Sequence, residues 1–262
     1  MLLLELDGDV IITRENPFSL NDKNICRLAK ELADYWKISK EKILLIHGGG
    51  NFTHVGGGQF SKSLQTGSEG KKPVSIKTWS MRKLNDRVLE NLVDNNLPVF
   101  PLQTSSIVTV TNNLTTINCA LLKKLVDLDY IPVLYGDIIP TASGGQVISE
   151  AIIAELIYEY FPINRIIVCS SMDGVPVNAQ NPSMGFVSKI NSENINQVLD
   201  NLGNSSLVNI KGAMQEELKI VYNVAVRAGV NAQIINGTKP GMLYQCLCGN
   251  ESLGTFIEGQ KK

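Results

Sequence analysis

The sequence predicts an α/β protein with a mainly parallel β-sheet covered by helices on both faces. Short apolar runs of four or five residues alternate with longer amphipathic segments along the chain. This alternation is typical of strand–helix–strand units. Several apolar runs end directly in glycine, and no linker or internal repeat divides the 262 residues. We therefore expect one domain whose strands end in glycine-rich turns.

The expected strands are short and apolar. The first, over residues 2–6, leads into Asp7-Gly8-Asp9, and the second, over 43–46, leads into His47 and three glycines. Further strands are expected over 98–102, 131–135, 166–169, 232–235 and 255–257, with a possible hairpin over 107–117. Ligands of such sheets bind beyond the carboxyl ends of the strands, where these glycines lie.

The expected helices carry apolar residues three and four positions apart. In the first, over 21–36, one face is formed by Ile25, Leu28, Ala29, Leu32 and Ala33. Further helices are expected over 75–95, 120–128, 149–160, 193–202 and 213–228. The segment 55–72 is rich in glycine, serine and lysine, which predicts a loop.

Composition excludes several classes of protein. The net charge of -1 does not provide the basic face that nucleic acids and anionic membranes select. No apolar run reaches the length of a membrane span, and the amino terminus lacks the basic region of a signal peptide. Five irregularly spaced cysteines, with a lone Cys246-x-Cys248 pair, indicate reduced thiols rather than zinc. We expect a cytoplasmic protein.

The most informative segment is His-Gly-Gly-Gly-Asn-Phe-Thr-His at 47–54, directly after a strand. Gly48, Gly49 and Gly50, followed by Asn51, let the backbone approach a ligand closely and present N–H groups to an anion. The segment is neither a Walker A loop nor a dinucleotide fingerprint. We interpret it as an anion site, with a tight strand-to-helix turn as the alternative.

The two histidines of this segment are predicted to differ in role. His54 would lie near a bound phosphate, where it could donate a hydrogen bond and stabilise charge, although a surface imidazole is the alternative. His47, at the strand end, is predicted to be a structural, hydrogen-bonded residue.

Three further segments point to the same ligand cleft. Gly136-Asp137 and Asp173-Gly174 are acid–glycine pairs at strand ends. Turn formation explains each pair alone, but their recurrence favours a shared cleft. Lys211-Gly212-Ala213-Met214 opens a helix, whose N–H groups and dipole form a further phosphate site that Lys211 could reach.

In their order along the chain, these segments resemble the amino acid kinase superfamily, most closely the isopentenyl phosphate kinase and fosfomycin resistance kinase branch. The resemblance rests on L-E-L-D-G-D at 4–9, H-G-G-G-N-F-T-H at 47–54, F-P-L-Q at 100–103, P-V-L-Y-G-D at 132–137, M-D-G-V at 172–175, K-G-A-M at 211–214, N-G-T-K-P at 236–240 and G-T-F-I at 254–257. It implies a three-layer αβα sandwich, a homodimer, an acceptor-binding part over about 1–160 and a part over about 161–262 that binds Mg-ATP.

The resemblance also implies site residues. On the acceptor side, His54 would contact a phosphate or phosphonate, together with Arg14, the glycines and Asn51 of segment 48–51, Gly136 and Asp137. On the nucleotide side the matching residues are Gly8, Asp173, Gly174, Gly212 and Met214.

Two charges are reversed relative to this family. Its lysines at the first loop and after the conserved methionine fall on Glu5 and Glu217, and its first loop G-G-S becomes Asp7-Gly8-Asp9. An anion in place of a cation beside a triphosphate turns attraction into repulsion. Lys211 and Arg14 are possible compensating cations. Glu5, Asp7 and Asp9 alternate, so they could face one side and hold a divalent ion.

Three functions follow from these residues. The first is a kinase that phosphorylates a phosphate or phosphonate acceptor from ATP, with Lys211 replacing the lost lysines. The second is an ATP-independent lyase, isomerase or hydrolase acting on an anionic substrate, with Glu5 or Glu217 as acid, base or metal ligand. The third is an inactive metabolite-binding protein. The kinase stands first.

Overall fold

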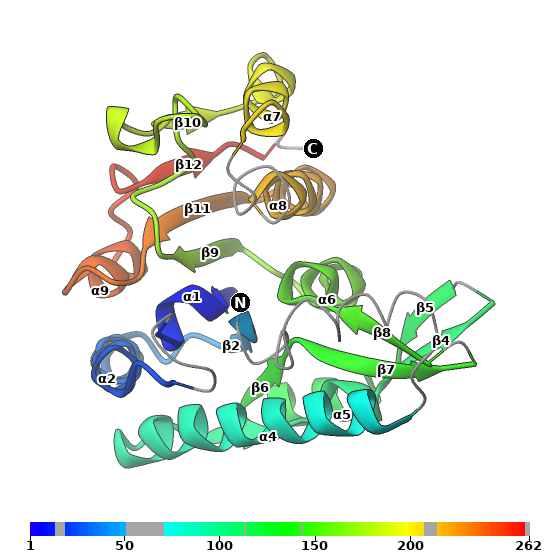
Figure 1. The fold of residues 1–262 in the computed structure, drawn as a ribbon. Helices are drawn as coiled ribbons and strands as arrows, with labels where there is room; N and C mark the ends of the chain where they lie inside the picture. Colours follow the sequence, from blue (N-terminus) through cyan, green and yellow to red (C-terminus); the bar gives the residue numbers. More distant parts are fainter. Residues whose placement is uncertain (14–18, 51–70, 113, 143, 207–213, 260–262) are drawn as a thin grey trace.

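The centre of the molecule is one eight-stranded sheet with the order β10-β12-β11-β9-β1-β2-β6-β3 (Figure 1). The computed structural model describes residues 1–13, 19–50, 71–112, 114–142, 144–206 and 214–259. The strands are β1 (Leu2–Leu6), β2 (Ile43–His47), β3 (Val99–Pro101), β6 (Ile131–Tyr135), β9 (Arg165–Ser170), β10 (Lys189–Ile190), β11 (Asn231–Asn236) and β12 (Thr255–Ile257). The strands from β11 to β3 are parallel, and β12 is antiparallel to β11. The predicted mainly parallel sheet is therefore confirmed.

Helices cover both faces of this sheet, as the three-layer prediction requires (Figure 1). One face carries α1 (Gly8–Ile11), α2 (Asp22–Ser39), α4 (Lys71–Asp94) and α9 (Met242–Leu247). The other carries α5 (Ala120–Asp127), α6 (Glu150–Ile157), α7 (Ile195–Gly203) and α8 (Gln215–Ala228). Strand β1 shows why two cores form, because alternate side chains point to opposite faces. Leu2, Leu4 and Leu6 pack toward α2 and α4, whereas Leu3 packs toward α6 and α8.

Two hairpins stand beside the sheet. The hairpin of β4 (Val108–Thr111) and β5 (Leu114–Ile117) confirms a prediction. The hairpin of β7 (Asp137–Thr141) and β8 (Gly144–Ile148) was not predicted. Pro140 and the Gly144-Gly145 pair interrupt its apolar alternation, which removed the usual strand signal.

The predicted helices differ from the observed ones mainly at their ends. The helix predicted over 149–160 ends at Ile157 and continues as a 3₁₀ turn over Tyr158–Tyr160. The short helices α1 and α9 were missed, because four or six residues are too few to show a periodic pattern.

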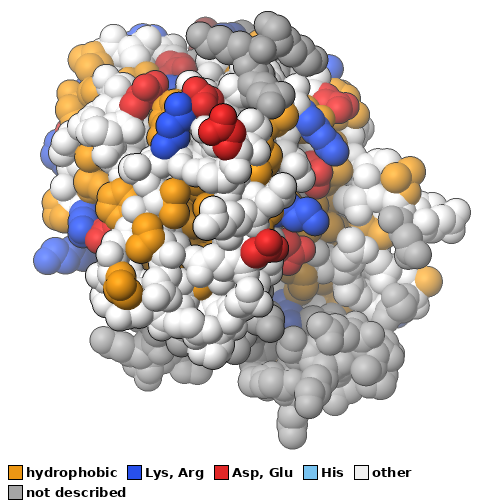
Figure 2. Space-filling view, turned by 90° about the horizontal axis from the view of Figure 1, so that it is seen from above, with side chains coloured by type: hydrophobic (Ala, Val, Ile, Leu, Met, Phe, Trp, Pro, Cys, Tyr) orange, Lys and Arg blue, Asp and Glu red, His pale blue; other side chains and the backbone are white. Residues whose placement is uncertain are grey.

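On the face shown in Figure 2, basic and acidic side chains are interspersed rather than gathered by sign. All five cysteines are free thiols. No helix among the described residues has the length and apolar character needed to cross a membrane.

Candidate active site

The glycine-rich turns meet at the carboxyl edge of the sheet. Leu6 of β1 pairs with His47 of β2 on one side and with Cys169 of β9 on the other, and His47 pairs in turn with Tyr135 of β6. Four neighbouring parallel strands therefore end at one level. Their following turns, which contain Gly8, Gly48 and Gly136, lie together as the sequence predicted.

The first two of these turns touch through their backbones. A Cβ on Gly48 would stand 2.6 Å from the backbone nitrogen of Gly8 and 2.5 Å from Glu150 Oε1. A Cβ on Gly8 would collide with the backbone of Gly50. Only glycine allows this approach, so the turns after β1 and β2 form one continuous surface of main-chain atoms.

His47 supports this surface from below. Its ring is fully buried, with Nδ1 3.0 Å from the Gly48 carbonyl oxygen and Nε2 3.1 Å from Oδ1 of Asn85 on α4. It stacks on Tyr135 at a centroid distance of 5.6 Å. Burial lowers the pKa of His47, which favours the neutral ring. The predicted structural role of this histidine is confirmed.

Five acidic side chains gather near the carboxyl end of β1. We call Glu5, Asp7, Asp9, Glu150 and Glu217 the carboxylate cluster. Glu5 is fully buried, on the same side of β1 as Leu3, and lies between Ile46 and Val168 of the neighbouring strands. Glu150 and Glu217 come from the first turns of α6 and α8, which cover this face.

The cluster leaves oxygen atoms without hydrogen-bond partners. Among the described residues, neither carboxylate oxygen of Glu5 has a partner, and the buried Oε1 of Glu217 has none. Asp7, Asp9, Glu150 and Glu217 each keep some exposed surface, so the cluster opens toward solvent while Glu5 forms its floor.

Burial and mutual repulsion favour the protonated forms of Glu5, Asp7, Glu150 and Glu217. Burial, followed by the charges of Glu150 and Asp7, raises the pKa of Glu5 to about 8. Burial and the neighbouring acids raise the pKa of Asp7 to about 7 and also raise the pKa of Glu150 and of Glu217. Burial is the largest cause of the raised pKa at each of these four acids. The site therefore holds protons near neutral pH or accepts a cation.

One prediction about these acids was wrong. Glu5, Asp7 and Asp9 do not alternate along a strand, because β1 ends at Leu6 and the chain turns into α1. Asp7 is the N-cap of that helix and accepts a hydrogen bond from the backbone nitrogen of Asp9 at 3.4 Å. In the described part of the chain, no three His, Cys, Asp or Glu side chains form a ready-made metal cage. The proposed metal ligation by Asp7 and Asp9 stays a prediction.

Glu150 is a site residue that the sequence reasoning missed. It follows the N-cap Ser149, whose hydroxyl accepts a hydrogen bond from the backbone nitrogen of Ile152 at 3.3 Å. An acid in the first turn after such a cap is normally explained by the helix dipole. Its position beside Gly48 and Gly136 depends on the fold and has no signal in the local sequence.

The Gly136-Asp137 pair anchors the turn after β6. The backbone nitrogen of Gly136 donates to the His47 carbonyl oxygen at 2.9 Å. Asp137 is fully buried, and its two oxygens accept from the backbone nitrogens of Ile138, at 2.8 Å, and Ser105, at 3.1 Å. These bonds give Asp137 a structural role, and its predicted contact with substrate stays a prediction.

On the other half of the sheet, Asp173 links the ends of β9 and β11. It accepts a hydrogen bond from Asn236 Nδ2 at 2.8 Å and forms an ion pair with Lys239 at 2.5 Å. These two contacts, Lys239 first, lower the pKa of Asp173. Gly174 packs against Thr255, whereas the Met214 side chain is buried in the core. The predicted nucleotide contacts at these positions stay predictions.

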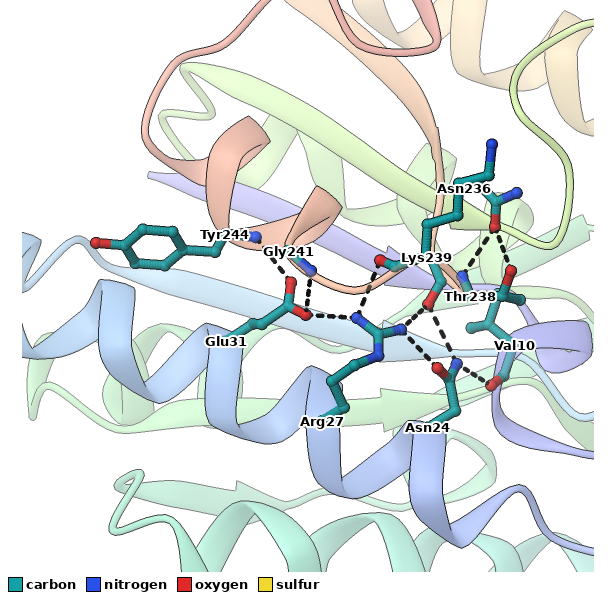
Figure 3. A network of polar contacts seen from close by, with 10 residues as sticks. Val10, Asn24, Arg27, Glu31, Asn236, Thr238, Lys239, Gly241 and Tyr244 are labelled. Carbon is teal, nitrogen blue, oxygen red and sulfur yellow. Dashed lines mark hydrogen bonds and ion pairs between the residues drawn. The ribbon is translucent and has the colours of Figure 1, made fainter.

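A polar network on α2 ties the two halves of this edge together (Figure 3). Asn24 Nδ2 donates to the carbonyl oxygen of Val10 in α1 at 2.7 Å and to that of Gly237 after β11 at 3.1 Å. Arg27 donates to Asn24 and to the Gly237 carbonyl oxygen, and it pairs with Glu31. Glu31 accepts from two backbone N–H groups near the start of α9. The turns after β1 and β11 are therefore fixed relative to each other.

Five predicted site residues fall outside the described part of the chain. These are Arg14, Asn51, His54, Lys211 and Gly212. Their proposed contacts with acceptor, phosphate or nucleotide stay predictions.

Known proteins resemble the chain over nearly its whole length. Isopentenyl phosphate kinase of Methanocaldococcus jannaschii is 26% identical over 271 residues, covering 98% of this chain and 98% of that protein. The isopentenyl phosphate kinase of Methanothermobacter thermautotrophicus is 24% identical over 278 residues, covering 99% and 100%. A crystal structure of isopentenyl phosphate kinase superposes with a TM-score of 0.77 at 22% identity, covering 98% of this chain and 99% of that one.

A family model supports the same relationship. The model of the amino acid kinase family matches residues 6–236, from the end of β1 to the end of β11. This span contains the turns after β1, β2, β6 and β9 whose backbones converge at the carboxyl edge. The chain therefore belongs to the amino acid kinase family.

Proposed function

We propose that this protein is a small-molecule kinase that transfers the γ-phosphoryl group of ATP to an acceptor that already carries a phosphate, of the isopentenyl phosphate type. An oxygen of the acceptor's phosphate attacks the γ-phosphorus, the bond to the bridging oxygen of ADP breaks, and ADP leaves. The observation that carries this proposal is the surface of main-chain atoms formed by Gly8 and Gly48 at the strand ends. The curated isopentenyl phosphate kinases, which match at full length, support it.

The two substrates are proposed to bind on either side of this surface. Residues of about 1–160 would hold the acceptor through the segment 48–51, Arg14, Gly136 and His54. Residues of about 161–262 would hold ATP through the turn at Asp173-Gly174, the start of α8 and Gly8 from the other part. The network on α2 keeps these turns in a fixed relation, which suits a reaction that depends on positioning.

Mg²⁺ is the expected companion of ATP, and it neutralises charge on the phosphoryl oxygens when bound. The donor set of the site fits such an ion, because the unpartnered atoms of Glu5 and Glu217 are all carboxylate oxygens. Lys211 is the proposed cation on the protein side. A phosphonate acceptor of the fosfomycin type presents the same tetrahedral dianion and is the second acceptor to test.

Turnover is tested by mixing the protein with Mg-ATP and isopentenyl phosphate and following ADP and the diphosphate product by ³¹P NMR. A parallel reaction contains fosfomycin. We expect Gly48→Ala to abolish turnover, because its Cβ would stand within 2.6 Å of the Gly8 nitrogen. The control is Gly203→Ala at the end of α7, where the new Cβ meets only the flexible Gln215 side chain.

Calorimetry with Mg-ATP separates binding from turnover. Binding without phosphorylation of either acceptor would favour the inactive metabolite-binding protein, unless another phosphate or phosphonate is phosphorylated. The absence of ATP binding would refute the kinase and direct attention to ATP-independent chemistry at the same acids. Lys211→Ala is expected to retain the fold and lose turnover, and an active variant would exclude this lysine from the reaction.

We also propose a cytoplasmic homodimer. Trp79 and Val93 of α4 and Phe100 of the edge strand β3 are exposed apolar side chains that a second copy would cover. The exposed thiols of Cys26 and Cys248 suit a reducing compartment. Light scattering of the purified protein tests the dimer, and a single-copy mass would exclude it.

A further inference from the structure

Four acids of the carboxylate cluster have no cationic partner among the described residues. Within the described ranges, Glu5, Asp7, Glu150 and Glu217 form no ion pair with lysine or arginine. Elsewhere in the molecule, acids in similar surroundings do have partners: Glu41 pairs with Arg165 at 2.7 Å. The unpaired Glu5 and Glu217 therefore contrast with the paired Glu41.

The unpartnered oxygens of the cluster belong to two of its acids, Glu5 and Glu217. A buried carboxylate oxygen that accepts no hydrogen bond is costly, because it loses its water and gains nothing in return. Both oxygens of Glu5 and one of Glu217 are in this state among the described residues. Glu5 approaches from the sheet and Glu217 from the first turn of α8, which packs over the same face. A small positive ligand between them would satisfy all three atoms.

We infer that the carboxylate cluster binds a divalent cation of the Mg²⁺ or Mn²⁺ class, with Glu5 and Glu217 as its protein ligands. Carboxylate oxygens are the donors that these hard cations prefer. Mg²⁺ usually takes only one or two carboxylates and keeps several waters. A cage of three protein side chains, which the described residues lack, is therefore not required. Asp7 and Glu150, which stay partly exposed, would accept hydrogen bonds from the coordinated waters.

The consequence for phosphoryl transfer rests on the proposed function. Without a cation, the phosphates of ATP would face the acids of the cluster and be repelled. A divalent ion held by Glu5 and Glu217 would reverse this, because it would supply positive charge beside those phosphates. The cation would thus supply the positive charge that lysine side chains supply at these two positions in the family that the sequence resembles.

The test uses Mn²⁺ alone, without nucleotide, on full-length protein stripped of metal with a chelator. Free Mn²⁺ is followed by electron paramagnetic resonance during a titration. We expect the wild-type protein to bind one Mn²⁺ per chain and Glu217→Gln to weaken binding by at least about tenfold. Glu5→Gln is expected to have the same effect. The matched control is Glu216→Gln, an exposed acid beside Glu217 on α8, which is expected to bind as the wild type does.

Two results would overturn the inference: Mn²⁺ that stays free at millimolar concentration, or binding that survives unchanged in Glu217→Gln. Circular dichroism checks the fold of each variant. If Glu5→Gln does not fold, the Mn²⁺ affinity of Glu217→Gln, a change at a partly exposed position, tests the inference alone. The proposed function is judged separately. Mn²⁺ binding without ATP binding would support the cation site and refute the kinase. Turnover by a protein that binds no Mn²⁺ on its own would support the kinase and refute the cation site.

Discussion

Replacing Glu5 by glutamine should change how the stability of the metal-free protein depends on pH. The folded protein raises the pKa of this carboxyl from the ordinary 4.5 to about 8, mainly because the side chain is buried. A raised carboxyl pKa means that the folded state holds a proton that the unfolded state has released. The contribution of Glu5 to stability is therefore fully present below about pH 4.5 and is lost as the pH rises toward about 8.

The size of the effect follows from the same two values. The difference between 4.5 and about 8 corresponds to roughly 5 kcal/mol, at about 1.4 kcal/mol per pH unit. This is a ceiling, because a charged Glu5 can recruit water or a cation and so reduce the cost. Glu5→Gln carries no charge at any pH. It should match the wild-type stability near about pH 5 and exceed it by at least about 2 kcal/mol near about pH 9.

Urea unfolding in chelator-containing buffers between about pH 5 and pH 9 measures this difference. His47, Asp7, Glu150 and Glu217 also have shifted pKa values. Both proteins contain these groups, so the part of their influence that does not depend on the Glu5 charge cancels when the two curves are subtracted. Glu216→Gln, which removes an exposed acid, should give a curve parallel to that of the wild type. If the stability of Glu5→Gln also changed with pH in parallel with the wild type, the raised pKa of Glu5 would be refuted. Such curves would show that Glu5 titrates alike in the folded and unfolded states.

Three further predictions concern buried polar groups. Lys77→Met should stabilise the protein by about 1–2 kcal/mol at neutral pH. The lysine is 3% exposed, makes no polar contact among the described residues and has a pKa lowered by burial. A lower free energy of unfolding in urea would contradict this. Asn24→Ala should destabilise by about 2–4 kcal/mol, since two backbone carbonyl oxygens lose a donor; an unchanged urea midpoint would show that the network of Figure 3 is dispensable. Asn85→Ala should cost about 1–3 kcal/mol, since the buried His47 ring loses its side-chain partner; thermal unfolding measures it, and an unchanged melting temperature would contradict it.

Much of the fold could be predicted because its signals are local. The strand at Ile131–Tyr135 and the final strand at Thr255–Ile257 have the predicted limits, since each is a short apolar run between polar turns. Helix α2 shows the predicted apolar face and ends three residues later than expected, at Ser39. The meeting of the glycine turns followed from one rule, that parallel strands end at a common edge.

The rest depended on contacts between distant segments. The carboxylate cluster joins β1, α1, α6 and α8. The family resemblance placed Glu5 and Glu217 at one phosphate site, but nothing in the sequence around Glu150 indicates that Glu5 lies near it. The capping turn at Asp7 was also hidden, because the pattern Glu-Leu-Asp-Gly-Asp fits an extended strand as well as a strand followed by a helix. Local patterns therefore located the edge of the sheet, whereas the electrostatics of the site required the packed structure.

The position of Glu5 gives a physical reason to regard the acidic site as functional. Its neighbours in the sheet are Ile46 and Val168, and on its own strand Leu3 points to the same core. An apolar side chain would satisfy every packing requirement there, and a charged one costs several kcal/mol unless it is paired. A folded protein that keeps an acid in such a place breaks a local rule, and natural proteins do so mainly at functional sites. Leucine would make this strand position more stable. The presence of an acid there is therefore evidence that Glu5 binds a ligand.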